Sequence, residues 1–392
     1  MFDKMRKYCL LSLLLFSTFF VDGQNYNLRS ITMDNGLSHL VVNAFYKDSK
    51  GFMWIATDNG LNKFDGVSLI KYYYSASEIV KNRITAIAEW HNDMYLASDF
   101  GLMKLNMETK NLELIAREKI DVAVSSIIVD SVNKVLYIGT KSGLYVLKPD
   151  DSVERYQLDK NVLSAGNVIT GMTIGPKQLL WLATKKGLYS FNLQTKSAKN
   201  YEFIADNTDV NIFSKVTRVQ NMLVLGTFNA GLVTFDIATA KFDRFIDLGF
   251  DYVNDLSSDN QDIVYVSGNG IRFVSLKERR VVQTLSYVSR QNSTIRSNSV
   301  YSFLKDRDGI IWIGYYMLGF DYSLYQRDIF KIYSLLPEFD SKDLYVRTFL
   351  IRGSEKLIGT REGLYYVNEA KRIVRKLNQE QLRSNTVISL CQ

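Results

Sequence analysis

The chain has 392 residues, of which 46% are hydrophobic and 13% are aromatic, so it can bury a large core. It contains three prolines and no low-complexity stretch, which excludes a disordered protein. The formal net charge is +7, but no basic run and no alternation of basic with aromatic residues predicts a nucleic-acid surface, so we expect no nucleic-acid partner.

Residues 1–24 predict a secretory signal peptide, with Lys4, Arg6 and Lys7 ahead of an apolar run of about 12 residues. That run is shorter than a membrane-spanning helix requires. We therefore expect an exported protein. After this segment Cys391 is the one remaining cysteine, so no intramolecular disulfide is available and the fold must rest on packing.

One pattern recurs from residue 54 to the end of the chain, first as WIATDNGLNKFD (54–65) and next as YLASDFGLMKLN (95–106). Each copy contains a glycine followed by an apolar residue, and these glycines lie about 39 to 49 residues apart, which is typical of a repeat made of one four-stranded propeller blade. The eight glycines are Gly60, Gly101, Gly143, Gly187, Gly231, Gly270, Gly319 and Gly363.

Each part of the copy has a structural interpretation. An apolar run ends in a small residue, which lets neighbouring blades approach closely near the centre of the ring. The next position is Thr or Ser in six copies; its hydroxyl could bond between blades or line the channel, although threonine also simply suits a strand. The glycine supplies the positive φ of a tight hairpin turn. The small residues are Ala56, Ala97, Gly139, Ala183, Gly226, Ser267, Gly314 and Gly359, and the hydroxyl residues are Thr57, Ser98, Thr140, Thr184, Thr227 and Thr360.

The ends of the ring can also be predicted. Residues 25–33 are expected to add a strand to the last blade, near residues 329–333, because closure removes the exposed sheet edge. In the seventh copy Tyr315 replaces the hydroxyl residue and Ser323 replaces an apolar one, which indicates closure there. An eight-bladed single ring is the alternative. The predicted blades are residues 34–80, 81–120, 121–160, 161–207, 208–247, 248–292 and 293–335.

The predicted fold class is therefore all-β, a seven-bladed β-propeller of four-stranded antiparallel blades followed by the start of a second propeller. Residues 1–24 are assigned to the signal peptide and 25–335 to the propeller. Residues 336–392 are assigned to the first blade and the start of the second blade of a second, incomplete propeller. Trp90, in a polar turn, is the tryptophan expected to be exposed.

No motif for catalysis or metal binding is found. The only histidines are His39 and His91, and two distant histidines make neither a metal ligand set nor a catalytic triad. Aspartates in the first turn of each repeat, such as Asp48 and Asp306, are expected to stabilise that turn rather than to act as paired acids. We predict no catalytic residue, no metal and no cofactor.

A ligand is expected on the face where the glycine turns converge, because their tips vary on a constant frame. Two tyrosines suit stacking on a sugar ring, three cations suit an acidic group, and two aspartates complete the set. Ordinary solvated turns are the alternative interpretation of each position. In the same order, the candidates are Tyr315 and Tyr316, then Lys185, Lys186 and Arg361, then Asp58 and Asp99.

The opening ITMDNGLSHLVVNAFYKDSKGFMWIATDNGLNKFDG (31–66) resembles the first repeat of the two-component regulator propeller family, and the resemblance extends over residues 28–392. Members of this family are periplasmic sensor regions of hybrid two-component systems in Bacteroidetes. The resemblance implies two seven-bladed propellers, a β-sandwich, a membrane helix and a histidine kinase. Because this chain ends inside a repeat, we expect a fragment or a truncated product.

The resemblance implies a periplasmic ligand-sensing domain that detects an oligosaccharide, or another small ligand, and regulates polysaccharide utilisation. It implies a homodimer in the full-length sensor and membrane attachment only through a C-terminal part absent here. We expect the chain itself not to be an enzyme, since it lacks kinase and catalytic motifs. The alternatives are a propeller polysaccharide hydrolase or lyase, and a non-enzymatic protein-interaction scaffold.

Overall fold

A computed structural model of the chain divides into two compact units, Met1–Tyr325 and Gln326–Gln392. Among the residues that the structure describes, which are given at the end of this paragraph, no helix is long and apolar enough to span a membrane. The predicted signal peptide and Cys391 lie outside the described residues. The structure describes residues 26–74, 82–176, 179–205, 208–209, 211–228, 230–246, 248–249, 252–288, 295–323, 345–353, 355–361, 363–368, 373–377 and 386–390.

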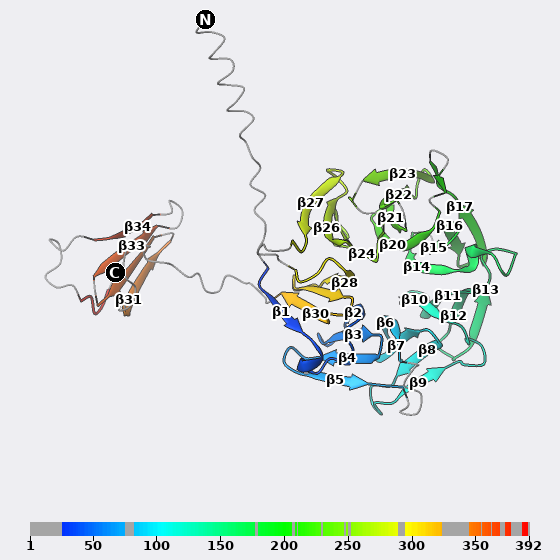
Figure 1. The fold of residues 1–392 in the computed structure, drawn as a ribbon, viewed down its shortest axis with the longest axis horizontal. Coiled ribbons are helices and arrows are strands. Elements are labelled where there is room, and N and C mark those ends of the chain that lie inside the picture. The colour runs from blue at the N-terminus through cyan, green and yellow to red at the C-terminus, as the bar shows by residue number, and fades with distance from the viewer. Residues whose placement is uncertain are drawn as a thin grey trace, which may run out of the picture. The chain divides into compact units, whose positions relative to one another are not determined.

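Seven four-stranded antiparallel sheets, called blades one to seven below, make up the described part of the first unit (Figure 1). Blades one to three comprise β2 (Val42–Lys47), β3 (Met53–Thr57), β4 (Gly60–Phe64) and β5 (Leu69–Tyr72); β6 (Ile84–Trp90), β7 (Asp93–Ser98), β8 (Gly101–Leu105) and β9 (Leu112–Ile115); and β10 (Val124–Asp130), β11 (Val135–Thr140), β12 (Gly143–Leu147) and β13 (Val153–Tyr156).

Blades four to seven continue the same order. They comprise β14 (Ile169–Ile174), β15 (Leu179–Thr184), β16 (Gly187–Asn192) and β17 (Ser197–Tyr201); β20 (Phe213–Val219), β21 (Met222–Thr227), β22 (Leu232–Asp236) and β23 (Lys241–Ile246); β24 (Asp255–Ser258), β25 (Ile263–Gly268), β26 (Gly270–Ser275) and β27 (Arg280–Leu285); and β28 (Val300–Lys305), β29 (Ile311–Tyr315), β30 (Phe320–Ser323) and β1 (Leu28–Ile31). Minor elements are the 3-10 turns Met33–Asn35 and Ala165–Asn167 and the two-stranded β18 (Ile204–Ala205) and β19 (Thr208–Asp209).

The ring closes after seven blades. Strand β1 pairs antiparallel with β30, with Leu28 opposite Ser323 and Ile31 opposite Phe320. The first strands of successive blades lie side by side around the ring, and β28 of blade seven lies beside β2 of blade one (Figure 1). This closure rules out the eight-bladed ring. The amino-terminal strand joins blade seven as predicted, but its partner is Phe320–Ser323; the expected partner, residues 329–333, lies outside the described residues.

The small residue at the end of each second strand has the predicted purpose. A Cβ on Gly139 would lie 2.6 Å from Ile169 Cγ2, and one on Gly226 would lie 2.6 Å from Val253 Cγ1. Both obstructing side chains belong to the next blade: Ile169 begins its inner strand β14, and Val253 lies two residues before its inner strand β24. A larger residue would push the neighbouring blades apart, because protein interiors are already close-packed.

The conserved geometry of the glycine turns comes from the hydroxyl residue that precedes them. Thr57 Oγ1 donates to Gly60 O at 2.9 Å, and the same bond joins Ser98 to Gly101 at 2.8 Å. The hydroxyl also accepts from a backbone N–H inside the turn, such as Asn59 N at 3.1 Å. The hydroxyl therefore closes its own turn, rather than bonding between blades or lining the channel.

A different set of side chains links the blades near the channel. Near the start of an inner strand, a polar side chain donates to a backbone carbonyl of the next blade. This bond is present in the described residues at six of the seven junctions. The pairs are Asn43 to Ile84 O, Thr85 to Val124 O, Ser125 to Ile169 O, Thr170 to Phe213 O, Asn254 to Val300 O and Ser302 to Val42 O. At the remaining junction, between blades five and six, Ser214 Oγ has no partner among the described residues.

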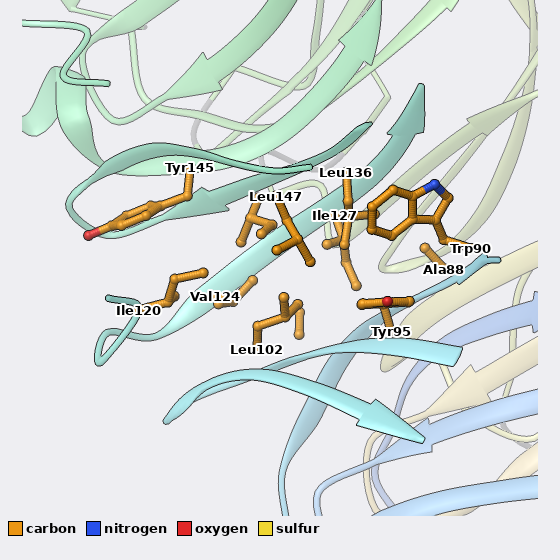
Figure 2. Close-up of a cluster of buried hydrophobic side chains, with 12 residues drawn as sticks. Ala88, Trp90, Tyr95, Leu102, Ile120, Val124, Ile127, Leu136, Tyr145 and Leu147 are labelled. Atoms are coloured by element: carbon orange, nitrogen blue, oxygen red, sulfur yellow. The ribbon is translucent and has the colours of Figure 1, made fainter. Parts of the chain in front are cut away.

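Apolar clusters fill the space between adjacent blades. Figure 2 shows the cluster between blades two and three, where Leu102 of blade two faces Val124 and Leu136 of blade three. Trp90 belongs to this cluster and is 7% exposed, so the prediction that it is exposed is wrong. It ends strand β6 and turns inward against Tyr95, with ring centroids 5.3 Å apart.

The second unit contains one four-stranded sheet, β31 (Val346–Arg352), β32 (Glu355–Thr360), β33 (Leu364–Asn368) and β34 (Ile373–Lys376). It repeats the turn bond, with Thr360 Oγ1 donating to Gly363 O at 2.8 Å. Val387 N donates to Thr360 O at 2.9 Å, as Val253 N donates to Thr227 O in the ring at 3.1 Å. Val387 thus makes the bond that Val253 makes beside an inner strand of the ring. The assignment of residues 336–392 to a second, incomplete propeller stays a prediction. The predicted boundary at 335/336 lies outside the described residues.

Ring closure predicts a difference between a buried and an exposed position of β1. Ile31 is buried against Phe320 and Trp312, so Ile31→Ala should lower the free energy of unfolding by about 2–4 kcal/mol. Arg29 is an exposed residue of the same strand, and Arg29→Ala should change the free energy of unfolding by less than about 0.5 kcal/mol. Urea unfolding followed by tryptophan fluorescence measures both, since all four tryptophans lie in the ring. Equal effects would show that β1 does not stabilise closure.

The junction bonds predict a second difference, between serines at the same repeat position. Ser125→Ala removes a bond to Ile169 O of 2.5 Å, which should cost about 1 kcal/mol. Ser214→Ala removes a buried hydroxyl that has no partner in the described residues, so it should be neutral or stabilising. The same unfolding measurement compares them, and a larger loss for Ser214→Ala would contradict the prediction.

Candidate functional site

The glycine turns present varied side chains from a constant backbone, and the face that they form with the residues preceding each inner strand is called the glycine-turn face. At the turns of blades one, three, four, five and seven, the first turn residue donates its N–H to the residue before the inner strand of the same blade. Asp58 N bonds Val41 O at 3.3 Å, and Tyr316 N bonds Ser299 O at 3.0 Å. The same bond occurs at Lys141, Lys185 and Phe228. Because the backbone repeats, the chemistry of this face is decided by side chains alone.

Blades one and two form a charged sector of this face. Arg83 lies between two turns, with Nε donating to Asp58 Oδ1 at 3.0 Å and one terminal nitrogen donating to both oxygens of Asp99 at 3.1 Å. Asn43 Nδ2 also donates to Asp58 Oδ1, at 2.9 Å. All of these side chains are partly exposed. The sector thus holds two carboxylates and one guanidinium in a fixed arrangement.

Blades five to seven form an aromatic sector. Tyr301 and Tyr316 are stacked, with ring centroids 5.1 Å apart and planes 29° apart. Phe228 and Tyr252 form a second pair, with centroids 5.5 Å apart. Tyr316 is 50%, Tyr252 46% and Phe228 38% exposed, so their rings face solvent. Exposed aromatic groups gathered at one place are unusual on a soluble protein and indicate a binding surface.

The two sectors meet at Tyr301. Burial raises the pKa of its phenol, and Tyr252, Tyr316 and Asp58 raise that pKa further, while Arg83 lowers it. The Tyr301 hydroxyl therefore lies within the electrostatic reach of both the aromatic and the charged sectors.

Blades three and four present lysines. Lys141, Lys185 and Lys186 are exposed at their turns. Lys186 Nζ donates to Asp159 Oδ2 at 3.2 Å. The Ser164 hydroxyl first, then the Asn161 backbone N–H and Lys186, lower the pKa of Asp159 to about 2. This lysine sector is the part of the face with an excess of positive charge.

Apart from Tyr315, the candidates predicted from sequence fall into the three sectors of the ring and the second unit. Asp58 and Asp99 come together through Arg83, and Tyr316 joins the aromatic sector. Lys185 and Lys186 lie in the lysine sector. Arg361 is exposed on the second unit, where its N–H bonds Tyr345 O at 3.1 Å, and so it is described apart from the others.

The expectation that Tyr315 stacks on a ligand is wrong, because its side chain is fully buried. Its hydroxyl donates to Asp321 Oδ2 at 2.8 Å, and Arg296 Nε donates to Asp321 Oδ1 at the same distance. Burial and the adjacent carboxylate raise the pKa of Tyr315 far above its ordinary value. The tyrosine that replaces the usual hydroxyl residue therefore satisfies a buried carboxylate of the closing blade.

Sequence reasoning missed Arg83, Tyr252 and Tyr301. Tyr301 had a readable signal, because the equivalent positions of the other blades are Asn43, Thr85, Ser125, Thr170, Ser214 and Asn254, all small or polar. Arg83 and Tyr252 precede inner strands and lie outside the recurring pattern. The recurring pattern therefore gives no signal for these two residues.

The opposite face of the ring carries the aspartates of the first turns, and their role is structural as predicted. Asp48 accepts N–H bonds from Lys50 and Phe52 and the indole N–H of Trp54 at 2.8 Å. Asp306 repeats this arrangement with Trp312, and Lys47 of blade one bonds its Oδ2 at 2.9 Å. Among the described residues, no group of three or more His, Cys, Asp or Glu side chains is arranged to hold a metal ion.

A cavity of about 270 Å³ lies between blades three and four on that opposite face. Glu154 is its charged centre: Lys148 donates to it at 2.6 Å, Lys196 of blade four donates at 3.1 Å, and Tyr156 OH donates as well. Its carboxylate is therefore fully engaged within the protein. The lining residues are Asn133, Val135, Tyr137, Val146, Lys148, Glu154, Tyr156, Phe191, Leu193 and Lys196.

This arrangement is that of a β-propeller, and comparison with family models agrees. Residues 15–153 match the model described as TSS9, PorZ, N-terminal beta-propeller domain. Residues 294–317 match the model described as Two component regulator propeller. The predicted resemblance to two-component regulator propellers is thus confirmed. No curated protein matches the sequence.

Solved structures with the same fold include extracellular domains of two component systems. One, described as the extracellular domain of a hybrid two component system from B. thetaiotaomicron, is 22% identical with a TM-score of 0.64, and the match covers 93% of this chain and 50% of that one. Another from the same organism is 17% identical with a TM-score of 0.67, covering 93% and 49%. Virginiamycin B lyase from Staphylococcus aureus is 10% identical with a TM-score of 0.56, covering 76% and 99%. At these identities the likeness shows the fold, and this chain spans about half of the two extracellular domains.

The Glu154 cluster predicts a contribution to stability that acid removes. Lys148 first, then Tyr156 and Lys196, lower the pKa of Glu154 from 4.5 to about 2. A carboxyl whose folded-state pKa is depressed stabilises the fold above its unfolded pKa, and this contribution is lost as pH falls from about 4.5 to 2. Glu154→Gln should therefore reduce stability at pH 7, by less than about 1 kcal/mol because the ion pairs are partly exposed.

The measurement is urea unfolding between pH 7 and 3 for the wild type and Glu154→Gln, in which the difference should shrink toward low pH. Glu113→Gln, at an exposed position on β9, is the matched control and should show no such trend. A difference that stays constant with pH would contradict the assignment.

Proposed function

We propose that this chain is the ligand-binding part of an extracytoplasmic sensor in a two-component signal-transduction system, and that its ligand is an oligosaccharide whose detection regulates polysaccharide utilisation. The observation that carries the proposal is the glycine-turn face: a repeated backbone frame with side chains sorted into charged, lysine and aromatic sectors. A frame fixed by the fold, with variable tips, suits recognition of a ligand. The two-component regulator propeller match and the likeness in fold to extracellular sensor domains support the same proposal.

Signalling by the whole sensor would work through packing. A ligand that binds one arrangement of the propellers more tightly shifts the population toward that arrangement. In a homodimer this shift would alter contacts between subunits, and a kinase in the part of the sensor beyond this chain would respond. The predicted signal peptide supports export to the periplasm, where such a ligand is met.

A binding role fits the chemistry of the face better than catalysis. A glycosidase needs one protonated and one ionised carboxyl flanking the scissile bond. Here Asp58 and Asp99 are both held in ion pairs with one side chain, Arg83, at 3.0 Å and 3.1 Å, so both are already engaged within the protein. The lyase likeness is confined to the fold, so a polysaccharide hydrolase or lyase is the less supported alternative.

A protein-interaction role is the second candidate, and a specific observation favours it. The model described as TSS9, PorZ, N-terminal beta-propeller domain matches residues 15–153, a longer stretch than the two-component match. Under this proposal the aromatic sector would contact a partner protein, and saccharides would leave the ring unaffected.

The test is thermal unfolding of the purified protein with a panel of oligosaccharides, followed by tryptophan fluorescence and by chromatography of the sugars. Sensing predicts a higher unfolding midpoint with one class of sugar and no cleavage; a ligand at 100 times its Kd adds about 2.7 kcal/mol. Stabilisation together with cleavage would support the enzyme. Absence of any shift across the panel would overturn the sensing proposal and favour the interaction role.

A further inference from the structure

We propose that the aromatic sector binds the face of an uncharged sugar ring, with the carboxylates of Asp58 and Asp99 accepting hydrogen bonds from its hydroxyl groups. This inference rests on the proposed function and assigns it to one part of the glycine-turn face. It names the residues that bind and excludes acidic sugars from that position.

The stacked tyrosines supply the apolar surface. Tyr316 has one ring face against Tyr301 and is 50% exposed, so its other face is open to solvent. The C–H bonds on a sugar ring are weakly polarised toward positive, and they complement the negative face of an aromatic ring. Tyr252 and Phe228 extend the aromatic surface over blades six and five, which gives space for further sugar units.

The charged sector supplies fixed hydrogen-bond acceptors. Both cross-turn bonds to Asp58, from Asn43 and from Arg83, end on Oδ1, and Oδ2 has no partner among the described residues. A hydroxyl donor suits that oxygen, because bonds to ionised acceptors are stronger than neutral ones. Arg83 holds Asp58 and Asp99 in place before a ligand arrives, which reduces the cost of ordering them on binding.

Tyr301 joins the two sectors and sits where the ring would otherwise place a junction bond. The other blades use this position for a small or polar side chain, and most of these donate to the next blade. In blade seven Ser302 makes the bond to Val42 O instead, at 3.1 Å. Because Ser302 makes the bond between blades, Tyr301 does not have to make it and can stack on Tyr316.

The net charge of the charged sector determines whether an uncharged or an acidic sugar is favoured beside it. Two carboxylates and one guanidinium leave a net charge of about −1 beside the stacked tyrosines, which disfavours a carboxylated or sulfated sugar there. The influence of Asp58 on the Tyr301 pKa agrees with this, since it outweighs that of Arg83. An acidic sugar would instead be drawn toward Lys141 and Lys185 in the lysine sector.

The experiment uses two probe panels, uncharged xylo-, cello-, manno- and malto-oligosaccharides and acidic oligogalacturonates and chondroitin sulfate fragments, with Kd measured by calorimetry. For the uncharged sugar that binds, Tyr316→Ala should raise Kd by about tenfold or more, because a lost stacking contact and its burial are worth about 1.4 kcal/mol. Asp58→Asn should also raise Kd for that sugar. Lys241→Ala, at an exposed position of blade five where β23 pairs with Asp236 at the end remote from the glycine turn, is the matched control and should leave Kd unchanged.

The outcomes separate this inference from the proposed function. If an uncharged sugar binds equally well to the wild type and to both Tyr316→Ala and Tyr301→Ala, the assignment is overturned while sensing stands. If acidic sugars bind and Lys185→Ala abolishes their binding, the site belongs to the lysine sector and the inference is again overturned. If neither panel binds, the oligosaccharide proposal itself fails. Equal unfolding midpoints of Tyr316→Ala and the wild type without ligand would confirm that the variant is folded, as expected for an exposed side chain.

Discussion

Closure of the ring is the constraint on which the rest of the structure depends. A row of blades has two uncovered faces at its ends, and each would expose the apolar residues that elsewhere lie between blades. Placing β28 beside β2 covers both faces at once, and β1 fixes that arrangement by supplying the outer strand of blade seven. Leu28 and Ser323 pair in this contact although they lie near opposite ends of the ring's sequence. All the blades between them in sequence must therefore be formed before the ring can close.

Within the closed ring, two kinds of side-chain hydrogen bond have different roles, one within each blade and one between blades. Bonds from Thr or Ser to the turn glycine close the tips of blades one to five, whereas bonds between inner strands tie the blades to one another. The exceptions are informative. Trp181 Nε1 has no partner among the described residues, because Gly175 stands six residues before it, where Asp48 stands before Trp54. The ring tolerates such missing bonds because each contributes little beside the packing between blades.

A rigid frame frees the tips to vary, and this explains how one face can hold three different chemistries. The tip backbone is satisfied by its own bonds, so a side chain such as Phe228 or Lys185 changes the surface without changing the blade. The charged and aromatic sectors adjoin because blade seven lies next to blade one in the closed ring. Closure thus brings Tyr301, near the end of the ring in sequence, within reach of Asp58, near its beginning.

The sequence by itself determined the blade: its period, the small residue that admits the next blade, the glycine turn and the aspartates that stabilise the first turn. These are requirements met within a few residues of the chain and repeated, so a pattern reveals them. Only the tertiary structure decided which tips meet, that Arg83 joins Asp58 to Asp99, that Trp90 and Tyr315 turn inward, and that β1 pairs with Phe320–Ser323. Those outcomes depend on how neighbouring blades adjoin and on side-chain rotamers set by packing, and neither is encoded in the spacing of one repeat.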